Sequence, residues 1–286
     1  MRKLIEVARS EDAIVAGLAN ALNLENKAIE IGENANLPVP IGTKRAHEKW
    51  RKRHKDNWKS QPSQGRGVMC YRFREGNRWL RNKSLMTENE YLWALKVRAN
   101  VVPTRVTMAR GTIGMNTNCR KCKEYPETTG HISGHCRAMK DLRLIRHDRV
   151  CISLTKAAEA AGYRIMEEPM CKFGLEKLKP DFILCSGEGT PCYVLDPTIV
   201  WDDSPNRLRK AWEGKVKKHT PLKPLLKQKY NPSTVQVYGF VCGAWGTWCP
   251  KNDEVVKILG LSKGRVRDIL QKVLCDTIRI KAFMNH

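Results

Sequence analysis

Four side chains of metal-binding type lie within one short stretch of the sequence. Cys119, Cys122, His131 and Cys136 follow the spacing C-x2-C-x8-H-x4-C, and three thiolates with one imidazole form the tetrahedral ligand set that Zn²⁺ prefers. His135 is the alternative fourth ligand, but it directly precedes Cys136, so we expect His131 to bind. Because protein fills all four positions, the pattern predicts a structural zinc knuckle rather than a catalytic metal. The other eight cysteines show no such grouping and are interpreted as small buried apolar residues.

Two aspartates adjoin apolar segments that have the pattern of β-strands. Asp181 follows Lys179-Pro180 and directly precedes residues 182–184, and Asp196 ends a second apolar segment, residues 193–195. Neighbouring strands would bring both carboxylates to one edge, where carboxylate oxygens bind Mg²⁺ and the ion activates water for attack on a phosphate. A lysine from residues 212–219 would neutralise the oxyanion. Aspartate also caps turns and strand ends, so a structural role for both is the open alternative.

Lysine and arginine are concentrated ahead of the knuckle. Residues 44–83 hold 14 of them against three acids, a net charge of +11, and five aromatic side chains are interleaved: Trp50, Trp58, Tyr71, Phe73 and Trp79. Basic groups neutralise phosphates and aromatic faces stack on unpaired bases, so this mixture indicates nucleic-acid binding. The alternative is a solvated basic helix whose tryptophans anchor it to the fold. The basic residues that we assign to nucleic-acid binding are Arg51, Lys52 and Arg53 in this stretch and Arg120, Lys121 and Lys123 in the knuckle.

The overall composition indicates the same partner. The 286 residues carry 52 Lys and Arg against 29 Asp and Glu, a formal net charge of +23. Self-repulsion of that size is neutralised by a polyanion, of which nucleic acid is the main candidate. The sequence has no apolar run of the ~18 residues that a membrane span requires. We therefore expect no membrane partner and a protein that works inside the cell.

Periodicity and capping signals predict the elements that position these residues. Thr87 and Glu90 have the spacing of a capping box, and apolar periodicity predicts the remaining elements. Helices are expected over residues 10–22, 87–100 and 205–219, in a segment that ends at Gly162, and in two segments that begin at Asn252 and Ser262. Strands are expected over residues 163–166, 182–185, 193–200 and 234–242. The predicted organisation is an N-terminal helix and linker (1–43), a basic, mainly helical region (44–116), the knuckle (117–138) and an α/β domain (139–286).

Ordered blocks of this sequence resemble a known family. They are GRGVMCYRFREGNRWL, YLWALKVRANVVPTR, the knuckle CRKCKEYPETTGHISGHC, RHDRV, EEP, KPDFIL, VLD, KVKKH and WGTW, and they extend from about residue 65 to residue 261. In this order they resemble the reverse transcriptases of non-long-terminal-repeat retrotransposons that carry a restriction-like endonuclease, above all the R-two type that inserts into ribosomal RNA genes. Many blocks at suitable spacing are more specific than any single motif.

The resemblance implies a fold and a set of site residues. In the family the knuckle precedes a PD-(D/E)xK nuclease fold, a mixed sheet flanked by helices. By position, Asp181 and Asp196 resemble the metal-binding acids, Lys215 the lysine that the family places on the downstream helix, and Lys218 a second, supporting lysine. The chain departs from the pattern at His219, where the family often has tyrosine, and it has no lysine two residues after Asp196. His147 and Glu168 are further candidates, with a helix-surface histidine and an exposed loop acid as the alternatives.

The resemblance also implies an activity. The family's polymerase motif, an apolar residue followed by Ala-Asp-Asp, is absent from this sequence, so we expect a carboxy-terminal fragment of the polyprotein that does not polymerise DNA. We expect a Mg²⁺-dependent endonuclease in the nucleus that nicks ribosomal DNA to prime reverse transcription of the element's RNA, with structural Zn²⁺ and no small-molecule substrate. The alternative is an inactive nucleic-acid-binding fragment that depends on the zinc knuckle.

Overall fold

The computed structural model describes residues 44–82, 86–173 and 176–282. The helix expected over residues 10–22 and the linker that follows it lie outside these ranges. In the described part no helix is long and apolar enough to cross a membrane. The predicted mixture of α-helices and β-strands is confirmed for residues 139–282.

The centre of the molecule is a mixed five-stranded sheet. Its order is β1 (Arg164–Glu167), β4 (Phe182–Cys185), β5 (Cys192–Val200), β6 (Val235–Gly243) and β7 (Thr247–Trp248). All neighbouring pairs are antiparallel except β5 and β6, which run parallel over nine residues. A parallel pair needs a crossover connection, and the helices α9 (Pro205–His219) and α10 (Leu222–Tyr230) form it.

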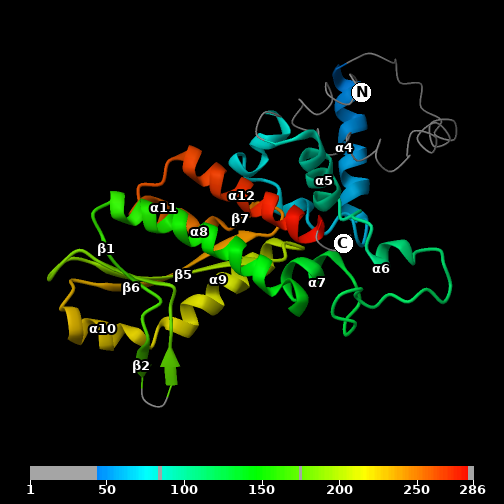
Figure 1. Cartoon of the computed structure of the whole chain (residues 1–286). Helices are drawn as coiled ribbons and strands as arrows, with labels where there is room; N and C mark the ends of the chain where they lie inside the picture. The colour runs from blue at the N-terminus through cyan, green and yellow to red at the C-terminus, as the bar shows by residue number, and fades with distance from the viewer. Residues whose placement is uncertain (1–43, 83–85, 174–175, 283–286) are drawn as a thin grey trace.

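Helices cover both faces of the sheet (Figure 1). On one face α8 (Lys140–Ala160), α11 (Asp253–Ile258) and α12 (Lys263–Ala282) pack against a cluster that includes Phe182 and Leu184. On the other face Ile183 and Val194 pack against α10. Alternate residues of β4 thus enter opposite apolar layers, as the period of a strand requires, and all four of its residues are buried.

Local signals place α9 as the sequence predicts. Ser204 is its N-cap and accepts a hydrogen bond from the backbone N–H of Arg207, and Pro205 occupies the first turn. The last turn carries Lys217 and Lys218, whose positive charges suit the negative end of the helix dipole. The bounds of this helix therefore agree with its N-cap residue and with the basic residues of its last turn.

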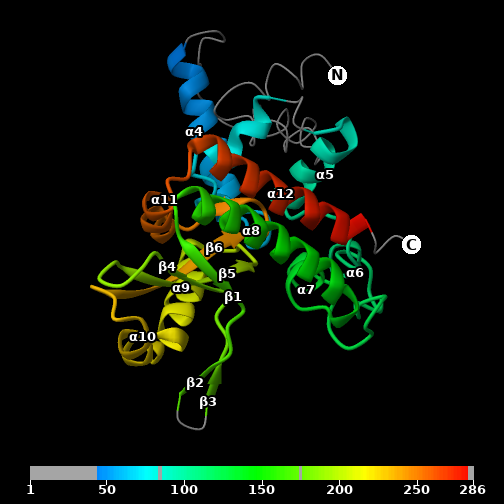
Figure 2. The ribbon, with the colours of Figure 1, turned by 60° about the vertical axis from the view of Figure 1, so that its left-hand side comes forward.

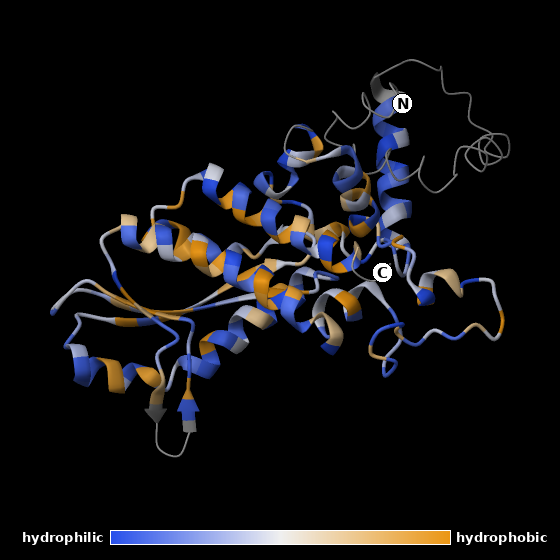
Figure 3. Cartoon of the chain, viewed as in Figure 1, coloured by the Kyte–Doolittle hydropathy of each residue, from blue (hydrophilic) through white to orange (hydrophobic). Residues whose placement is uncertain are grey.

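The basic region contributes a helix that extends from the body and a packed core. Its elements are α4 (Lys44–Ser60), the 3₁₀ turns η1 (Val68–Cys70) and η2 (Glu75–Leu80), and α5 (Glu88–Arg98). Both hydrogen bonds of the predicted Thr87–Glu90 capping box are present. Figure 3 shows that α4 is hydrophilic along its length. The core behind it includes Trp245, Leu274 and Ile278, so it joins the basic region to the α/β region.

The predicted stacking role of the interleaved aromatics is wrong for four of the five. Trp58, Tyr71 and Trp79 are buried, and Phe73 stacks on Trp248 in the core beside the sheet. Trp50 remains 47% exposed on α4. Burying aromatic side chains removes large apolar surfaces from water, and the anchoring alternative holds for these positions.

Some elements were not predicted. A two-stranded hairpin, β2 (Cys171–Phe173) with β3 (Glu176–Leu178), projects from the sheet between β1 and β4 (Figure 2). Helix α10 was also missed. The interpretation of the eight remaining cysteines as ungrouped, buried apolar residues fails at five of them. Cys151, Cys171 and Cys275 are only partly buried. Cys185 and Cys192 are buried but form a disulfide. They are directly opposite each other in the β4–β5 register, which brings their sulfurs together.

Candidate active site and metal-binding cluster

The four predicted zinc ligands lie together in the structure. The donor atoms of Cys119, Cys122, His131 and Cys136 are all within 4.8 Å of one another and all four residues are buried, so the cluster could hold a metal ion. The Sγ atoms of Cys119 and Cys136 are 3.8 Å apart, and Sγ of Cys122 is 3.3 Å from Nε2 of His131. As the spacing argument predicted, His131 and not His135 belongs to the cluster.

Short elements hold these ligands in place. Cys119 and Cys122 lie on a turn in which Lys123 has a left-handed φ of 64°, and the N–H of Lys123 donates to the carbonyl of Cys119. His131 lies on α7 (Thr129–Gly134), whose N-cap is Thr128, and it precedes the 3₁₀ turn η4 (Arg137–Met139). Burial lowers the pKa of His131, which favours the neutral imidazole that binds metal.

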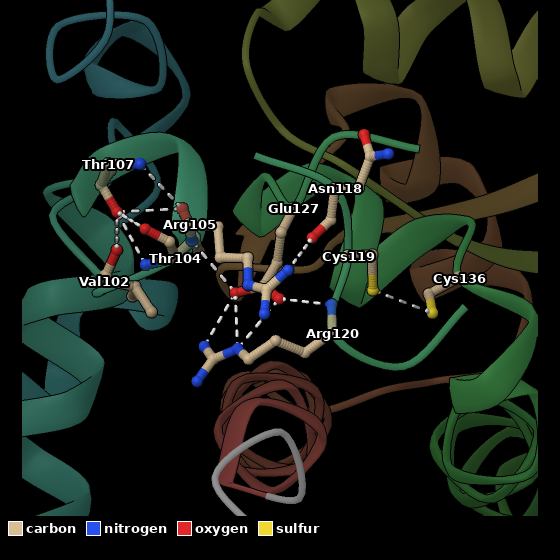
Figure 4. A network of polar contacts seen from close by, with 9 residues as sticks. All are labelled: Val102, Thr104, Arg105, Thr107, Asn118, Cys119, Arg120, Glu127 and Cys136. Atoms are coloured by element: carbon tan, nitrogen blue, oxygen red, sulfur yellow. Dashed lines mark hydrogen bonds and ion pairs between the residues drawn. The ribbon is translucent and has the colours of Figure 1, made fainter. Parts of the chain in front are cut away.

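A buried carboxylate fixes the knuckle from inside (Figure 4). Glu127 is 0% exposed and accepts from the side-chain Nη2 of Arg120 at 2.7 Å, the backbone N–H of Arg120 at 2.8 Å and the backbone N–H of Arg105 at 3.0 Å. Burial by itself raises the pKa of Glu127, but these hydrogen bonds lower it further than burial raises it. Arg105 begins α6 (Arg105–Met108), so the Glu127 carboxylate ties this helix, through the backbone N–H of Arg105, to the metal-binding turn that carries Arg120.

The predicted nucleic-acid-binding residues differ in how their side chains are engaged. Arg51, Lys52 and Arg53 are exposed on α4, and Lys123 is exposed on the knuckle. Arg120, by contrast, forms a bidentate contact with the buried Glu127. We therefore assign Arg120 a role in the fold of the knuckle.

The two predicted acids are cross-strand neighbours. Phe182 pairs with Leu195, so Asp181 and Asp196 are opposite each other one position further along the β4–β5 ladder. Asp196 is 2% exposed, while 21% of the Asp181 side chain remains exposed. Burial raises the pKa of Asp181, and the adjacent Asp196 raises it further because two like charges face each other.

Helix α9 supplies the partners of Asp196. Lys215 Nζ donates to Oδ1 of Asp196 at 2.7 Å, and His219 Nε2 lies 2.5 Å from Oδ2. Burial raises the pKa of Asp196, but the hydrogen bond with His219 and the charge of Lys215 overcome this effect, so the pKa lies well below its usual range. Lys215 and His219 are one helical turn apart, which allows one carboxylate to contact both.

Helix α8 supplies a partner for Asp181. Nε2 of His147 is 3.5 Å from Oδ2 of Asp181 and 3.3 Å from the carbonyl oxygen of Pro197. The hydrogen bond with Asp181 is the main reason that the pKa of His147 rises to about 11, with Cys151 adding to it. The helix-surface alternative for His147 is therefore wrong, because its side chain faces the carboxylate pair.

The remaining candidates lie at the margin of this site. Glu168, with a left-handed φ of 44°, pairs with Lys179, and its backbone N–H donates to the carbonyl of Asp181 at 2.8 Å. Lys218 is exposed, and the hydrogen bonds and ion pairs found for Asp196 in the described residues do not include it. His219 had no predicted role, although its spacing of four residues from Lys215 is a signal that could have found it.

Comparison with known proteins gives four consistent relatives. Over 194 residues the chain is 31% identical to a retrovirus-related Pol polyprotein from the type-1 retrotransposable element R2 of Popillia japonica. It is 33% identical over 120 residues to the polyprotein from the type-2 element R2DM of Drosophila melanogaster, and 25% identical over 183 residues to the R2 polyprotein of Nasonia vitripennis. All four relatives are Pol polyproteins of R2 retrotransposable elements, and this chain is similar to a part of each.

The matched region is only part of each R2 polyprotein. It covers 65% of this chain and 39% of the Popillia japonica protein, and 41% of this chain and 11% of the Drosophila melanogaster protein. For the Nasonia vitripennis protein the shares are 62% and 17%. A scan against protein-family models finds no match.

Proposed function

We propose that this chain provides the DNA endonuclease of an R2-type polyprotein, with a PD-(D/E)xK nuclease core. The observation that carries the proposal is the facing pair of carboxylates, Asp181 and Asp196, with Lys215 on Asp196 at 2.7 Å. Two acids on adjacent antiparallel strands and a lysine beside them have the composition of a metal-dependent phosphodiesterase centre. Helices on both faces of a mixed sheet are consistent with the proposed core.

The donor set suits Mg²⁺. Asp181 and Asp196 would hold the ion through carboxylate oxygens, the hard ligands that it prefers. Burial and the facing carboxylate of Asp196 raise the pKa of Asp181, and a divalent cation would offset the repulsion between the two carboxylates. When bound, Mg²⁺ activates a water molecule and stabilises negative charge on the phosphate. Lys215 holds Asp196 in orientation and places a positive charge beside the scissile phosphate, and His219 fixes the second oxygen of Asp196.

The other parts of the chain would hold the nucleic acid. A structural Zn²⁺ bound by Cys119, Cys122, His131 and Cys136 would fix the knuckle, which carries the exposed Lys123 and the half-buried Lys121. Exposed Arg51, Lys52 and Arg53 on α4 would contact phosphates. Lys218, exposed one turn from Lys215, would support it as a second cation near the substrate.

The R2 relationship suggests the substrate and the compartment. We propose that the chain nicks one strand of ribosomal DNA in the nucleus and exposes a 3′ hydroxyl that primes reverse transcription of the element RNA. The boundaries at residues 43, 116 and 138 remain our prediction of its domains.

A nicking assay on supercoiled plasmid with Mg²⁺ tests this function. Asp181→Asn is expected to abolish nicking and leave DNA binding intact, because it removes one charged metal ligand without changing the shape of the side chain. Asp268→Asn is the matched control, since its side chain is 53% exposed on α12 and pairs with the neighbouring Arg267. Nicking by the Asp181→Asn variant at the native rate would exclude the proposed site.

A second candidate function is a nucleic-acid-binding fragment without catalysis. One observation favours it, because both oxygens of Asp196 already have partners, Lys215 on Oδ1 and His219 on Oδ2. This function predicts retention on nucleic acid that disappears when zinc is chelated, and no nicks at any Mg²⁺ concentration. Mg²⁺-dependent nicks that Asp181→Asn removes would exclude it.

A further inference from the structure

A second group of metal-binding side chains lies beside the carboxylate pair. His147 and Cys151 are one turn apart on α8, and their donor atoms and a carboxylate oxygen of Asp181 all lie within 4.8 Å of one another. Helix α8 and the β4–β5 hairpin, far apart in sequence, bring these residues together. The proposed nuclease chemistry needs no thiol at this position, so Cys151 is unexplained by it.

We propose that His147, Cys151 and Asp181 form a second metal site, which takes a thiophilic divalent cation of the Zn²⁺ class. A thiol and an imidazole favour such an ion over Mg²⁺, which takes oxygen ligands. The site is separate from the knuckle but shares Asp181 with the proposed Mg²⁺ site. Its occupancy is therefore measured in the absence of Mg²⁺, and that measurement does not depend on whether the chain cleaves DNA.

The donor atoms are close enough for one ion to reach all three after a rotation of the imidazole. Nε2 of His147 is 3.8 Å from Sγ of Cys151 and 3.5 Å from Oδ2 of Asp181. Nδ1 is 3.5 Å from the same sulfur, so the ring would turn on binding to direct Nε2 toward the ion. With metal bonds of about 2.3 Å to sulfur and about 2.0 Å to nitrogen and oxygen, tetrahedral angles put Nε2 about 3.5 Å from the sulfur and about 3.3 Å from the carboxylate oxygen. The corresponding distance in the knuckle is shorter, with 3.3 Å between Sγ of Cys122 and Nε2 of His131. Binding would replace the contact of His147 with the carbonyl of Pro197.

The residues around His147 and the partial exposure of the ligands also favour a metal site. Nδ1 of His147 lies 3.5 Å from a carboxylate oxygen of Asp148, and a carboxylate on the second ring nitrogen orients metal-binding histidines. The side chains of His147 and Asp181 are 27% and 21% exposed, in contrast to the buried knuckle ligands. Three protein ligands at a partly exposed position leave the fourth place to water or a substrate oxygen, as in open zinc sites.

Metal counting on the full chain tests the proposal. The chain is stripped with a chelator and loaded with Co²⁺ or Zn²⁺. Bound metal is then counted after dialysis, and thiolate-to-cobalt charge-transfer absorption is recorded. We expect two ions per native chain, one in the knuckle and one in the new site. Cys151→Ser and His147→Gln should each bind one ion and lose part of the absorption.

The controls separate a lost ligand from a lost fold. Cys275→Ser changes another partly buried cysteine, which lies on α12 outside both clusters, and should keep two ions. His147→Gln alters a partly exposed side chain, so it tests the site even if Cys151→Ser does not fold. A native chain that binds one ion, or folded variants that keep two, would overturn the proposal. Because the readout is metal content, absence of nicking would count against the proposed nuclease and leave this result unaffected.

Discussion

Replacing Asp202 with asparagine should stabilise the protein, and more so at higher pH. Asp202 is 0% exposed, accepts from the backbone N–H of Trp245 at 3.0 Å and from the Thr247 hydroxyl at 2.8 Å, and lies beyond the end of β5. Burial raises its pKa from 3.8 to about 7, against the smaller opposing effect of these hydrogen bonds. An asparagine keeps the shape and can keep both contacts without a charge.

The magnitude follows from the linkage of protonation to folding. The folded-state pKa is the higher one, so the native chain is stabilised below the unfolded pKa of 3.8 and loses that stability as pH rises toward about 7. A shift of this size corresponds to about 4 kcal/mol in full, of which about 2.5 kcal/mol falls between pH 5 and pH 8. The advantage of Asp202→Asn in the free energy of unfolding should therefore grow by about 2.5 kcal/mol over this interval.

Urea unfolding at pH 5, 6.5 and 8, followed by tryptophan fluorescence, measures this difference. Effects of all other titrating groups cancel between the native chain and the variant. Asp268→Asn, on an exposed side chain, should show a small difference that stays the same at the three pH values. A constant difference for Asp202→Asn, or one that shrinks as pH rises, would refute the assignment of a raised pKa to buried Asp202.

Three further substitutions test other parts of the structure. Glu127→Gln should lower the free energy of unfolding in urea by about 2–3 kcal/mol, because it weakens charge-assisted hydrogen bonds to a buried group. Glu124→Gln, in which an exposed ion pair with Arg137 is lost, should have little effect. Thr87→Ala should lower the free energy of unfolding, measured by thermal unfolding, by about 1 kcal/mol, because α5 loses its N-cap. A difference near zero would mean that tertiary packing alone holds this helix. Trp79→Ala should lower the free energy of unfolding in urea by about 3–5 kcal/mol, since the side chain is 3% exposed in the core. A decrease below about 1 kcal/mol would contradict its burial.

Most elements of the fold could be predicted from local signals. The caps at Thr87 and Ser204 and the apolar segment 182–185 depend on neighbours a few residues away, and the structure has the corresponding elements. The hairpin β2–β3 and helix α10 were missed because they are short, with three residues in each strand and nine in the helix. Helix α10 is held by packing of Leu222 and Leu226 on the far face of the sheet, a contact that no local pattern contains.

The sequence by itself determined which residues could do chemistry. The spacing of Cys119, Cys122, His131 and Cys136 selects a metal cluster because each ligand reaches the ion across a short turn, and the structure brings the four together. The strand pattern around Asp181 and Asp196 likewise predicted their shared edge, because antiparallel pairing of adjacent strands fixes which residues face each other.

Only the tertiary structure decided which neighbours these residues have. His219 and His147 approach the carboxylates because α9 and α8 pack on opposite faces of the sheet, and the rotation of a packed helix is set by its whole buried surface rather than by one residue. Packing of the elements also buries Trp58 and Trp79 in the core and places Arg120 against the buried carboxylate of Glu127. Residue type limits what a side chain can do, and packing over distant segments determines whether it faces solvent, a core or another charge.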